Sequence, residues 1–427
     1  MADYNSLDYK RSRASYMAQC TIEYFVSLLV TDAFLAKLLT HIGISDSLIG
    51  IISSFITMAF VIQLASIALV RLKVSTKKLV ITFDTLSIFF FMALYIIPFL
   101  PIGKTMKTIL VVISVLIAYA GKYLIYSICY KWANSFVEPD KRARYSANKE
   151  IISLILGMGF TALVGYIIDR YEGLGNLEGG FIFIAVSILI LNICNFISLS
   201  MIKKEDEGEH ELERVSFGDV IKNTFKNRNF RNIIILTIMW DVGRYFTMGF
   251  IGVYKTNDLA LSVFMIQIIN IVASGIRALV SVPIGAYSDR TTFAKGFRLG
   301  IILTAIGYLA LVFTTKSTWW LIIVFTVFTY CGTAGTNQNS FNIAYSYVDS
   351  RYISQAMAIK NSIGGVLGFF ASIAGGRVVS VIQGNGNTVF GFAINAQQFL
   401  AGISFIIFIA AIVFMNMVIV KEKVMKQ

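Results

Sequence analysis

Long apolar runs, separated by short polar segments, fill the chain from Tyr16 to Val420. A helix needs about 20 mostly apolar residues to cross the hydrocarbon core of a bilayer, and these runs are close to that length or longer. They are too long and too uniformly apolar to be barrel strands, in which apolar and polar residues alternate. The pattern predicts an all-α membrane protein with twelve transmembrane helices, over Tyr16–Thr40, Ser47–Val70, Leu79–Leu100, Thr108–Tyr130, Ile151–Ile168, Phe181–Ile202, Ile233–Tyr254, Leu259–Ile284, Phe297–Thr315, Thr318–Tyr345, Met357–Ile382 and Gln398–Val420.

Charged residues are concentrated in alternate loops. The 427-residue chain holds 37 Lys and Arg against 24 Asp and Glu, which gives a formal net charge of +13. The loops after the odd-numbered predicted helices hold few of these bases, namely Lys104, Lys107, Arg170, Lys255 and Lys316. Because cytoplasmic loops collect Lys and Arg, the asymmetry predicts that both termini are cytoplasmic. It also explains the positive charge without a nucleic-acid partner.

The longest polar stretch divides the chain into two halves of six predicted helices. It runs from Lys203 to Asn232, begins with an acidic patch, and continues with apolar residues at near-helical spacing around Val215 and Phe225. Such a pattern is typical of an amphipathic helix on a membrane surface. We therefore expect an N-terminal six-helix bundle over residues 1–202, a cytoplasmic linker with an amphipathic helix over 203–232, and a C-terminal six-helix bundle over 233–427.

The two halves also resemble each other in sequence. The segment that begins at Val137 can be laid over the one that begins at Val348 without a gap. Five residues recur in step: Val137 and Val348, Glu138 and Asp349, Ala147 and Ala358, Lys149 and Lys360, Gly157 and Gly368. Two six-helix halves in parallel repeat, with a solute site between them, are a known transporter plan.

One loop carries a family motif. Gly285–Arg290, GAYSDR, is followed by the bases Lys295 and Arg298. It resembles the loop motif of the major facilitator superfamily, Gly-x-x-x-Asp-Arg followed by a basic residue, and lies at the matching place in the second half. The resemblance implies that the chain has this family's fold of two pseudo-symmetric six-helix bundles. It also implies that Asp289, with Arg290 beside it, gates the inner face.

The first half keeps only part of that motif. The equivalent loop, Val70–Lys78, has bases but lacks the glycine and the Asp-Arg pair, so we expect Asp84 to take the part of the missing acid in gating. Two patterns of the family's drug/proton antiporters are also absent. Helix 5 has no Gly-Pro, and helix 4 has Gly121-Lys122 in place of an arginine followed by glycine. Both absences favour uptake over drug efflux.

An acid and a base lie inside the seventh predicted helix. Asp241 lies about 12 Å along the helix from its start, close to the bilayer midplane. A charge at that depth costs at least about 2.5–3.5 kcal/mol, so it needs a partner or water. Arg244 follows at i+3 on the same face, so the two side chains can pair. We weigh two interpretations, a functional pair that lines a cavity and a structural ion pair that fixes helix packing.

Polar stripes lie on helices 1, 4, 7 and 10, which the resemblance assigns to a central cavity, and on helix 8, which adds Arg277. Glu23 has no base at i±3 or i±4, and we expect Glu23 and Asp241 to couple transport to protons. The alternative for Glu23 is a satisfied acid paired across helices with Lys122. The residues that we expect to bind solute are Lys122, Tyr126, Tyr130, Trp240, Arg244, Asn270, Arg277, Tyr330 and Asn337.

The residues of common catalytic and cofactor sites are missing from the sequence. The four cysteines form no CxxC pair, only two histidines exist, and no phosphate-binding G-x-x-x-x-G-K-[ST] loop is present. We therefore expect no cofactor, no metal site, no ATP-driven step and no enzymatic activity.

These patterns predict a secondary active transporter that imports a small polar organic solute by symport, with a sugar or glycoside favoured because the stripes mix Tyr, Asn and Gln. The coupling ion is expected to be a proton, with sodium as the alternative. The alternatives for function are an organic-anion symporter, proton-coupled efflux of amphiphilic compounds, and a receptor with this fold that transports nothing. We expect a monomer that lies in the lipid bilayer as a multi-pass protein of the plasma membrane, in a bacterial inner membrane.

Overall fold

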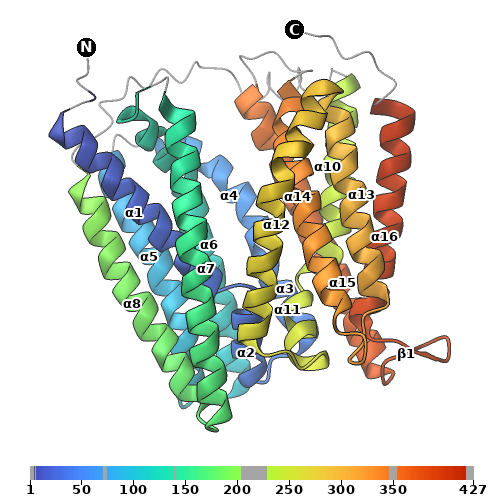
Figure 1. The fold of residues 1–427 in the computed structure, drawn as a ribbon. Helices are drawn as coiled ribbons and strands as arrows, with labels where there is room; N and C mark the ends of the chain where they lie inside the picture. The colour runs from blue at the N-terminus through green and yellow to red at the C-terminus, as the bar shows by residue number, and fades with distance from the viewer. Residues whose placement is uncertain are drawn as a thin grey trace. The chain divides into compact units, whose positions relative to one another are not determined.

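The computed structural model describes residues 4, 6–70, 75–138, 141–202, 228–345 and 353–419. The long elements of this part of the chain are all α-helices (Figure 1), and its one sheet is a two-stranded hairpin of β1 (Thr388–Val389) and β2 (Phe392–Ala393). This confirms the predicted helical class. Most of the expected linker, residues 203–227, lies outside the described residues, and α10 begins at Arg228.

Within the described residues, ten helical segments are long and apolar enough to cross a membrane. Two of the twelve predicted spans are not among them. The run Tyr16–Thr40 is divided into α1 (Leu7–Leu29) and α2 (Asp32–His41), because the chain leaves the helical conformation at Thr31 and Asp32 has a φ of 46°. The run Thr318–Tyr345 forms α14 (Leu321–Tyr345), whose second half carries the polar stretch TNQNS.

The chain forms two compact units, which are described separately. The N-terminal unit takes its residues from Met1–Ser45, Ala59–His210 and Ser262–Gln267. In this unit α1 packs against α7 and α8, and α5 packs against α6 and α8 (Figure 1). Its further elements are α4 (Phe55–Val70), which begins in the other unit, α5 (Thr76–Ile96), the 3₁₀ turn η1 (Ile97–Phe99), α6 (Lys104–Ser135), α7 (Arg142–Gly173) and α8 (Leu177–Met201).

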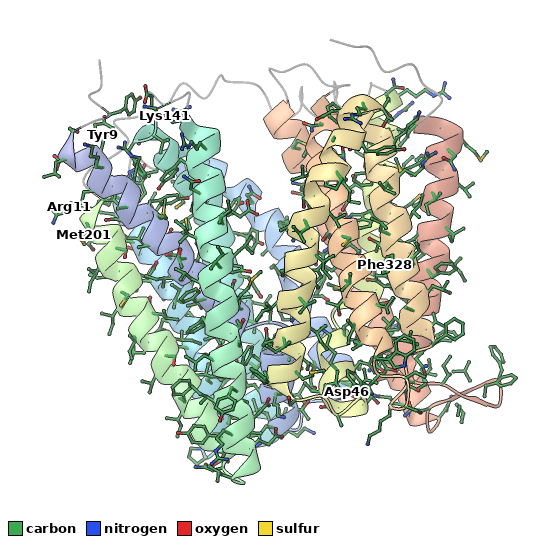
Figure 2. All side chains as sticks on the ribbon, in the orientation of Figure 1. Tyr9, Arg11, Asp46, Lys141, Met201 and Phe328 are labelled. Carbon is green, nitrogen blue, oxygen red and sulfur yellow. The ribbon has the colours of Figure 1, made fainter. Side chains whose placement is uncertain are left out.

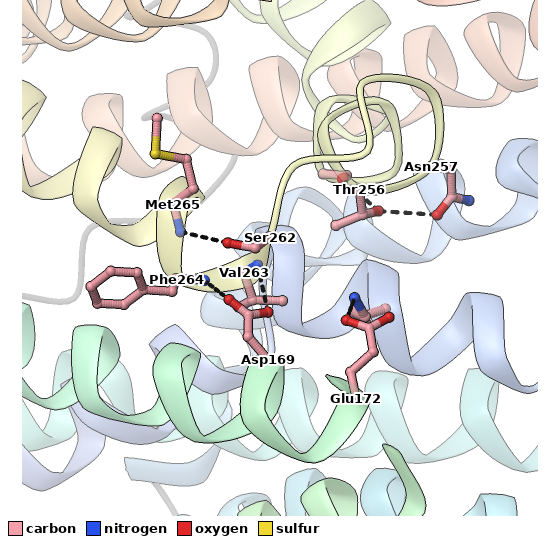
Figure 3. Close-up of polar contacts among 10 residues, drawn as sticks. Asp169, Glu172, Thr256, Asn257, Ser262, Val263, Phe264 and Met265 are labelled. Atoms are coloured by element: carbon pink, nitrogen blue, oxygen red, sulfur yellow. Dashed lines mark hydrogen bonds and ion pairs between the residues drawn. The ribbon is translucent and has the colours of Figure 1, made fainter. Parts of the chain in front are cut away.

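The first turn of α12 (Val263–Arg290) belongs to the N-terminal unit, and a side chain of α7 is hydrogen-bonded to it. The carboxylate of Asp169 accepts hydrogen bonds from the backbone N–H groups of Val263, at 2.9 Å, and Phe264, at 2.7 Å (Figure 3). The first N–H groups of a helix have no acceptor within it, and Asp169 supplies an acceptor for two of them. Gly165, one turn before Asp169, lets the two backbones approach, since a Cβ there would lie 3.1 Å from the Cα of Phe264.

The C-terminal unit takes its residues from Asp46–Met58, Glu211–Leu261 and Ile268–Gln427. Here α13 packs between α14 and α16, and α10 packs against α15 and α16. A Cβ at Gly332 of α14 would lie 2.6 Å from the carbonyl oxygen of Gly300 on α13, so small residues set the closest approach of these helices. The elements of this unit are α3 (Asp46–Ser53), α10 (Arg228–Met248), α11 (Ile251–Val253), the π-helical turn η3 (Tyr254–Asp258), the rest of α12, α13 (Phe293–Val312), α14, α15 (Ile353–Gly384), α16 (Ala396–Phe414) and the π-helical turn η4 (Met415–Ile419).

Large apolar side chains point outward from both units (Figure 2). Leu279 and Val282 of α12 are 77% and 76% exposed, and Leu163 of α7 is also exposed. Soluble monomers rarely expose apolar surface on this scale, whereas a lipid bilayer would cover it. Two charged residues that Figure 2 labels, Arg11 and Lys141, lie toward the same end of the N-terminal unit.

Candidate functional site

Five polar side chains form a continuous network inside the N-terminal unit. Glu23 of α1 accepts a hydrogen bond from the amide of Gln19 at 3.2 Å and forms an ion pair with Lys122 of α6 at 2.8 Å. The same Gln19 amide nitrogen donates to Asp84 of α5 at 3.2 Å, and Asn195 of α8 donates to Asp84 at 2.7 Å. One amide group therefore links two carboxylates.

Helix geometry explains why these side chains meet. Gln19 and Glu23 are four residues apart, so they share one face of α1. Gly121 lets α6 lie close to α5, because a Cβ there would lie 3.2 Å from the carbonyl oxygen of Phe83. The hydroxyl of Ser87 ties the same two helices by donating to the carbonyl of Ala118 at 2.7 Å. The close approach brings Lys122 and Asp84 to the same level of the unit.

The network holds two acids and one base. Gln19 and Asp84 are each 2% exposed and Asn195 is fully buried, whereas the side chains of Glu23 and Lys122 are 26% and 21% exposed. Lys122 pairs with Glu23, and the recorded partners of Asp84 are the neutral amides of Gln19 and Asn195. With both acids ionised, one lysine would face two negative charges at buried positions, which is costly in free energy. One proton on the network would remove the excess of negative charge.

Three further residues of this unit were predicted to bind solute or to gate: Tyr126, Tyr130 and Asp84. Tyr126 is 54% exposed, and its ring stacks on that of Tyr123 with centroids 6.0 Å apart. The side chain of Tyr130 is outside the described residues. Asp84, which we expect from the family motif to gate, lies deep in the network; its gating role stays a prediction.

Asp241 and Arg244 of α10 do not form an ion pair in the described structure. The Asp241 carboxylate lies directly against Gly364 of α15, and it interacts electrostatically with Arg244 and, more weakly, with Lys360 of α15. Lys360 is 2% exposed and donates to the hydroxyl of Ser340 on α14 at 2.7 Å. The expected pairing at i and i+3 is therefore an electrostatic interaction without direct bonding, and Asp241 is shared with Lys360 across helices.

The guanidinium of Arg244 lies close to two aromatic rings of its own helix. Its guanidinium carbon is 5.3 Å from the ring centroid of Trp240 and 5.2 Å from that of Tyr245. Trp240 is 6% exposed and packs against Phe297 and Phe408, so it forms a rigid wall beside the guanidinium. The Nε atom of Arg244 is buried and has no hydrogen-bond partner.

The remaining predicted residues of the C-terminal unit are distributed over α12 and α14. Arg277 is partly buried near Cys331, and Asn337 is exposed. Asn270 lies on α12 and Tyr330 on α14, and both are partly buried with partners of their own. The structure brings Trp240 and Arg244 together, while none of its recorded contacts joins them to these four residues.

The two predicted gate residues of this unit end α12. Asp289 and Arg290 are exposed in its last turn. No side-chain contact of Asp289 is recorded among residues 228–345 and 353–419, and the segment 346–352, which precedes α15, is outside the described residues. Their gating role therefore stays a prediction.

The structure brings three residues into the site that the sequence did not assign to it. Gln19 belongs to the polar stripe of the first predicted helix, and Lys360 stands out in the repeat. Asn195 interrupts the apolar run Phe181–Ile202, and that interruption is the signal that could have identified it. In each case the missing information was the partner on another helix.

The sequence model of the Major Facilitator Superfamily matches residues 17–372 of the chain. Among solved structures, the nucleoside transporter NupG is 14% identical with a TM-score of 0.67, covering 98% of this chain and 100% of that one. A D-xylose-proton symporter is 15% identical with a TM-score of 0.70, covering 94% and 96%. The POT family transporter PepTSo is 10% identical with a TM-score of 0.68, covering 96% and 99%. The chain matches none of the curated proteins compared with it.

Proposed function

The chain belongs to the major facilitator superfamily, and from this premise we propose that it is a proton-coupled symporter that takes up a small polar organic solute by alternating access. The observation that carries the proposal is the network of the N-terminal unit, in which Glu23 and Asp84 share the amide of Gln19 and one lysine, Lys122, balances them. A multi-pass membrane protein keeps such a group of charges inside its spans only at a high cost. A role in moving protons gives a reason for keeping it.

The proposed coupling step is the opening of the pair between Glu23 and Lys122. A proton on Glu23 removes its negative charge, so the attraction to Lys122 is lost and the lysine is free to contact solute. Loss of the proton restores the pair. Because Gln19 donates hydrogen bonds to both acids, a change in the charge of Glu23 is transmitted to Asp84. Asp241 remains the second candidate for coupling, through its interaction with Lys360.

A sugar or glycoside is the favoured solute class. The mixture of Tyr, Asn and Gln on the predicted cavity helices suits hydroxyl groups, which both donate and accept hydrogen bonds. The similarity to a D-xylose-proton symporter and to a nucleoside transporter, whose substrate contains a sugar, supports this class at the level of the fold. The residues proposed to bind are those expected from the sequence: Lys122, Tyr126, Tyr130, Trp240, Arg244, Asn270, Arg277, Tyr330 and Asn337.

The proposal includes twelve spans, with α1 and α2 forming the first and α14 the tenth, and both termini in the cytoplasm. It places the protein in a bacterial plasma membrane as a monomer. Asp289 and Arg290 at the end of α12 are the proposed inner gate.

The experiment is uptake of labelled solutes by proteoliposomes under an imposed pH gradient, with Glu23→Gln as the variant. We expect Glu23→Gln to abolish uphill accumulation and to keep counterflow exchange, because the amide cannot exchange a proton yet fills the same space. Glu150→Gln, which changes an exposed acid of α7, is the matched control and should accumulate solute normally.

Uphill accumulation by Glu23→Gln at the wild-type level would show that Glu23 is not the proton carrier. Accumulation of amphiphilic dyes in inside-out vesicles would favour efflux instead, and a folded protein that exchanges no solute would favour the receptor interpretation.

A further inference from the structure

We infer that the transported solute carries an anionic oxygen group, a carboxylate or a phosphate, and that Arg244 of the C-terminal unit binds this group. The inference rests on the proposed function and names the class of solute more closely. It starts from Arg244, a partly buried cation of α10 that forms no ion pair in the described structure.

The first observation is the surroundings of Arg244. The faces near its guanidinium are occupied by Trp240 and Tyr245, at 5.3 and 5.2 Å, and its buried Nε atom has no hydrogen-bond partner. A buried N–H group without an acceptor is rare in native proteins, and one on a charged group is costlier still. An acceptor that arrives with the solute would explain why this one is tolerated.

The second observation is that the nearest acid, Asp241, is shared with a second base and forms no ion pair with Arg244. Asp241 is three residues away, yet its carboxylate lies against Gly364 of α15, and the cation across the helix boundary is Lys360. Lys360 in turn donates to the neutral hydroxyl of Ser340 at 2.7 Å. Asp241 is therefore shared between two cations and bonded to neither in the described structure.

The third observation is the balance of charge. Among the described side chains of α10, α12 and α15, four charged ones are at least partly buried: Asp241, Arg244, Arg277 and Lys360. Three are bases and one is an acid, so the interior of these helices has an excess of positive charge. A neutral sugar would leave that excess in place, whereas a solute with a carboxylate or a phosphate would reduce it.

Arginine is also suited to this task by its shape. The planar guanidinium presents parallel N–H groups that match the two oxygens of a carboxylate or phosphate, and such paired hydrogen bonds are stronger than neutral ones. The rings of Trp240 and Tyr245 restrict the orientation of the guanidinium and attract its charge. An arginine held in this way is ready to receive an anion without reorganising.

The test is direct binding to the purified full-length protein in nanodiscs without any ion gradient, measured by calorimetry. The probes are glucose, glucuronate and glucose 6-phosphate, with gluconate and glycerol 3-phosphate to vary the carbon skeleton. We expect at least one of the four anions to bind more tightly than glucose, and Arg244→Gln to weaken that binding by about tenfold or more. Arg244→Lys should also weaken it, because the ammonium keeps the charge and loses the paired geometry.

Arg377→Gln, which removes an exposed base of α15, is the matched control and should bind the anion as the wild type does. A circular dichroism spectrum and a monodisperse elution profile for Arg244→Lys establish that the variant is folded. The separate responses to glucuronate and to glucose 6-phosphate show whether the group is a carboxylate or a phosphate.

Three results would overturn the inference. They are binding of glucose as tightly as of the anions, failure of all four anions to bind, and anion binding that Arg244→Gln and Arg244→Lys leave unchanged. Since no gradient is used, the outcome is independent of proton coupling. A protein that binds the anion yet shows no proton-driven uptake would overturn the symport proposal and leave the role of Arg244 standing.

Discussion

The polar network of the N-terminal unit and the charged side chains inside α10, α12 and α15 of the C-terminal unit carry opposite excesses of charge. In the N-terminal unit, Glu23 and Asp84 share one base, Lys122, through a chain of recorded hydrogen bonds. In the C-terminal unit, one acid, Asp241, faces several bases, of which Arg244 has an unsatisfied nitrogen. An excess of acid is suited to holding a proton and an excess of base to binding an anion. Under the proposed symport, the two units would thus be specialised for the two species that are carried.

The largest expected effect is the loss of the single base of the N-terminal network. Lys122→Met leaves Glu23 and Asp84 without a cation at positions where water is scarce. Breaking a buried pair in this way typically costs about 3–5 kcal/mol, and the partial exposure of both side chains favours the lower end. An SDS unfolding titration in mixed micelles measures the free energy of unfolding.

The matched control is Lys141→Met, which removes the base of a pair with Glu138 that lies at the protein surface. Exposed pairs contribute about 0–1 kcal/mol, so this variant should be close to the wild type. Equal losses for Lys122→Met and Lys141→Met would contradict the importance assigned to the N-terminal network.

The second-largest expected effect is a loss of stability when the contact between Asp241 and α15 is disturbed. A methyl group at Gly364 would collide with the Asp241 carboxylate and lie 3.2 Å from Cγ2 of Thr237. We expect Gly364→Ala to destabilise the protein by about 1–3 kcal/mol, as overpacking usually does. Gly275→Ala on α12 is the control, because nothing lies within 4 Å of an added Cβ there, and alanine in a helix is more stable than glycine by about 0.5–1 kcal/mol. A Gly364→Ala protein as stable as Gly275→Ala would mean that Asp241 does not face α15.

The smallest effect compares one substitution in the two units. Asp84→Asn removes a negative charge from the network that holds two acids and one base. Asp241→Asn removes the one at least partly buried acid from helices that hold three such bases. We expect Asp84→Asn to leave the free energy of unfolding unchanged or to raise it, and Asp241→Asn to lower it by about 1 kcal/mol or more. The same SDS titration measures both, and changes of the same sign and size would remove the contrast between the units.

The sequence was sufficient to predict the helical membrane fold and to single out most of the charged residues of the candidate site. Ionisable residues in apolar runs are rare, so Glu23, Lys122, Asp241 and Arg244 stand out without any structure. The ion pair between Glu23 and Lys122 was one of the two interpretations that the sequence left open, and the structure contains it. This pairing does not exclude a proton on Glu23, which stays a prediction.

The sequence does not show which side chain on another helix each polar residue contacts. Helical periodicity places Asp241 and Arg244 on one face, but it does not say toward which neighbour each side chain turns, and Asp241 turns to Gly364. Asn195 lies 111 residues from Asp84, and no local pattern relates the two. The break between α1 and α2 had a local signal, since Thr31 and Asp32 are typical of a helix start, but the length of the apolar run outweighed it.

The most direct test of the account is the movement of protons when solute enters proteoliposomes that have no gradient to begin with. A pH-sensitive dye outside weakly buffered vesicles should report alkalinisation when a transported solute is added to the wild-type protein. The same addition should give no alkalinisation with Glu23→Gln, although labelled solute still exchanges. Alkalinisation at the wild-type rate in a protein that carries both Glu23→Gln and Asp84→Asn would contradict the claim that the acids of the N-terminal unit carry the proton.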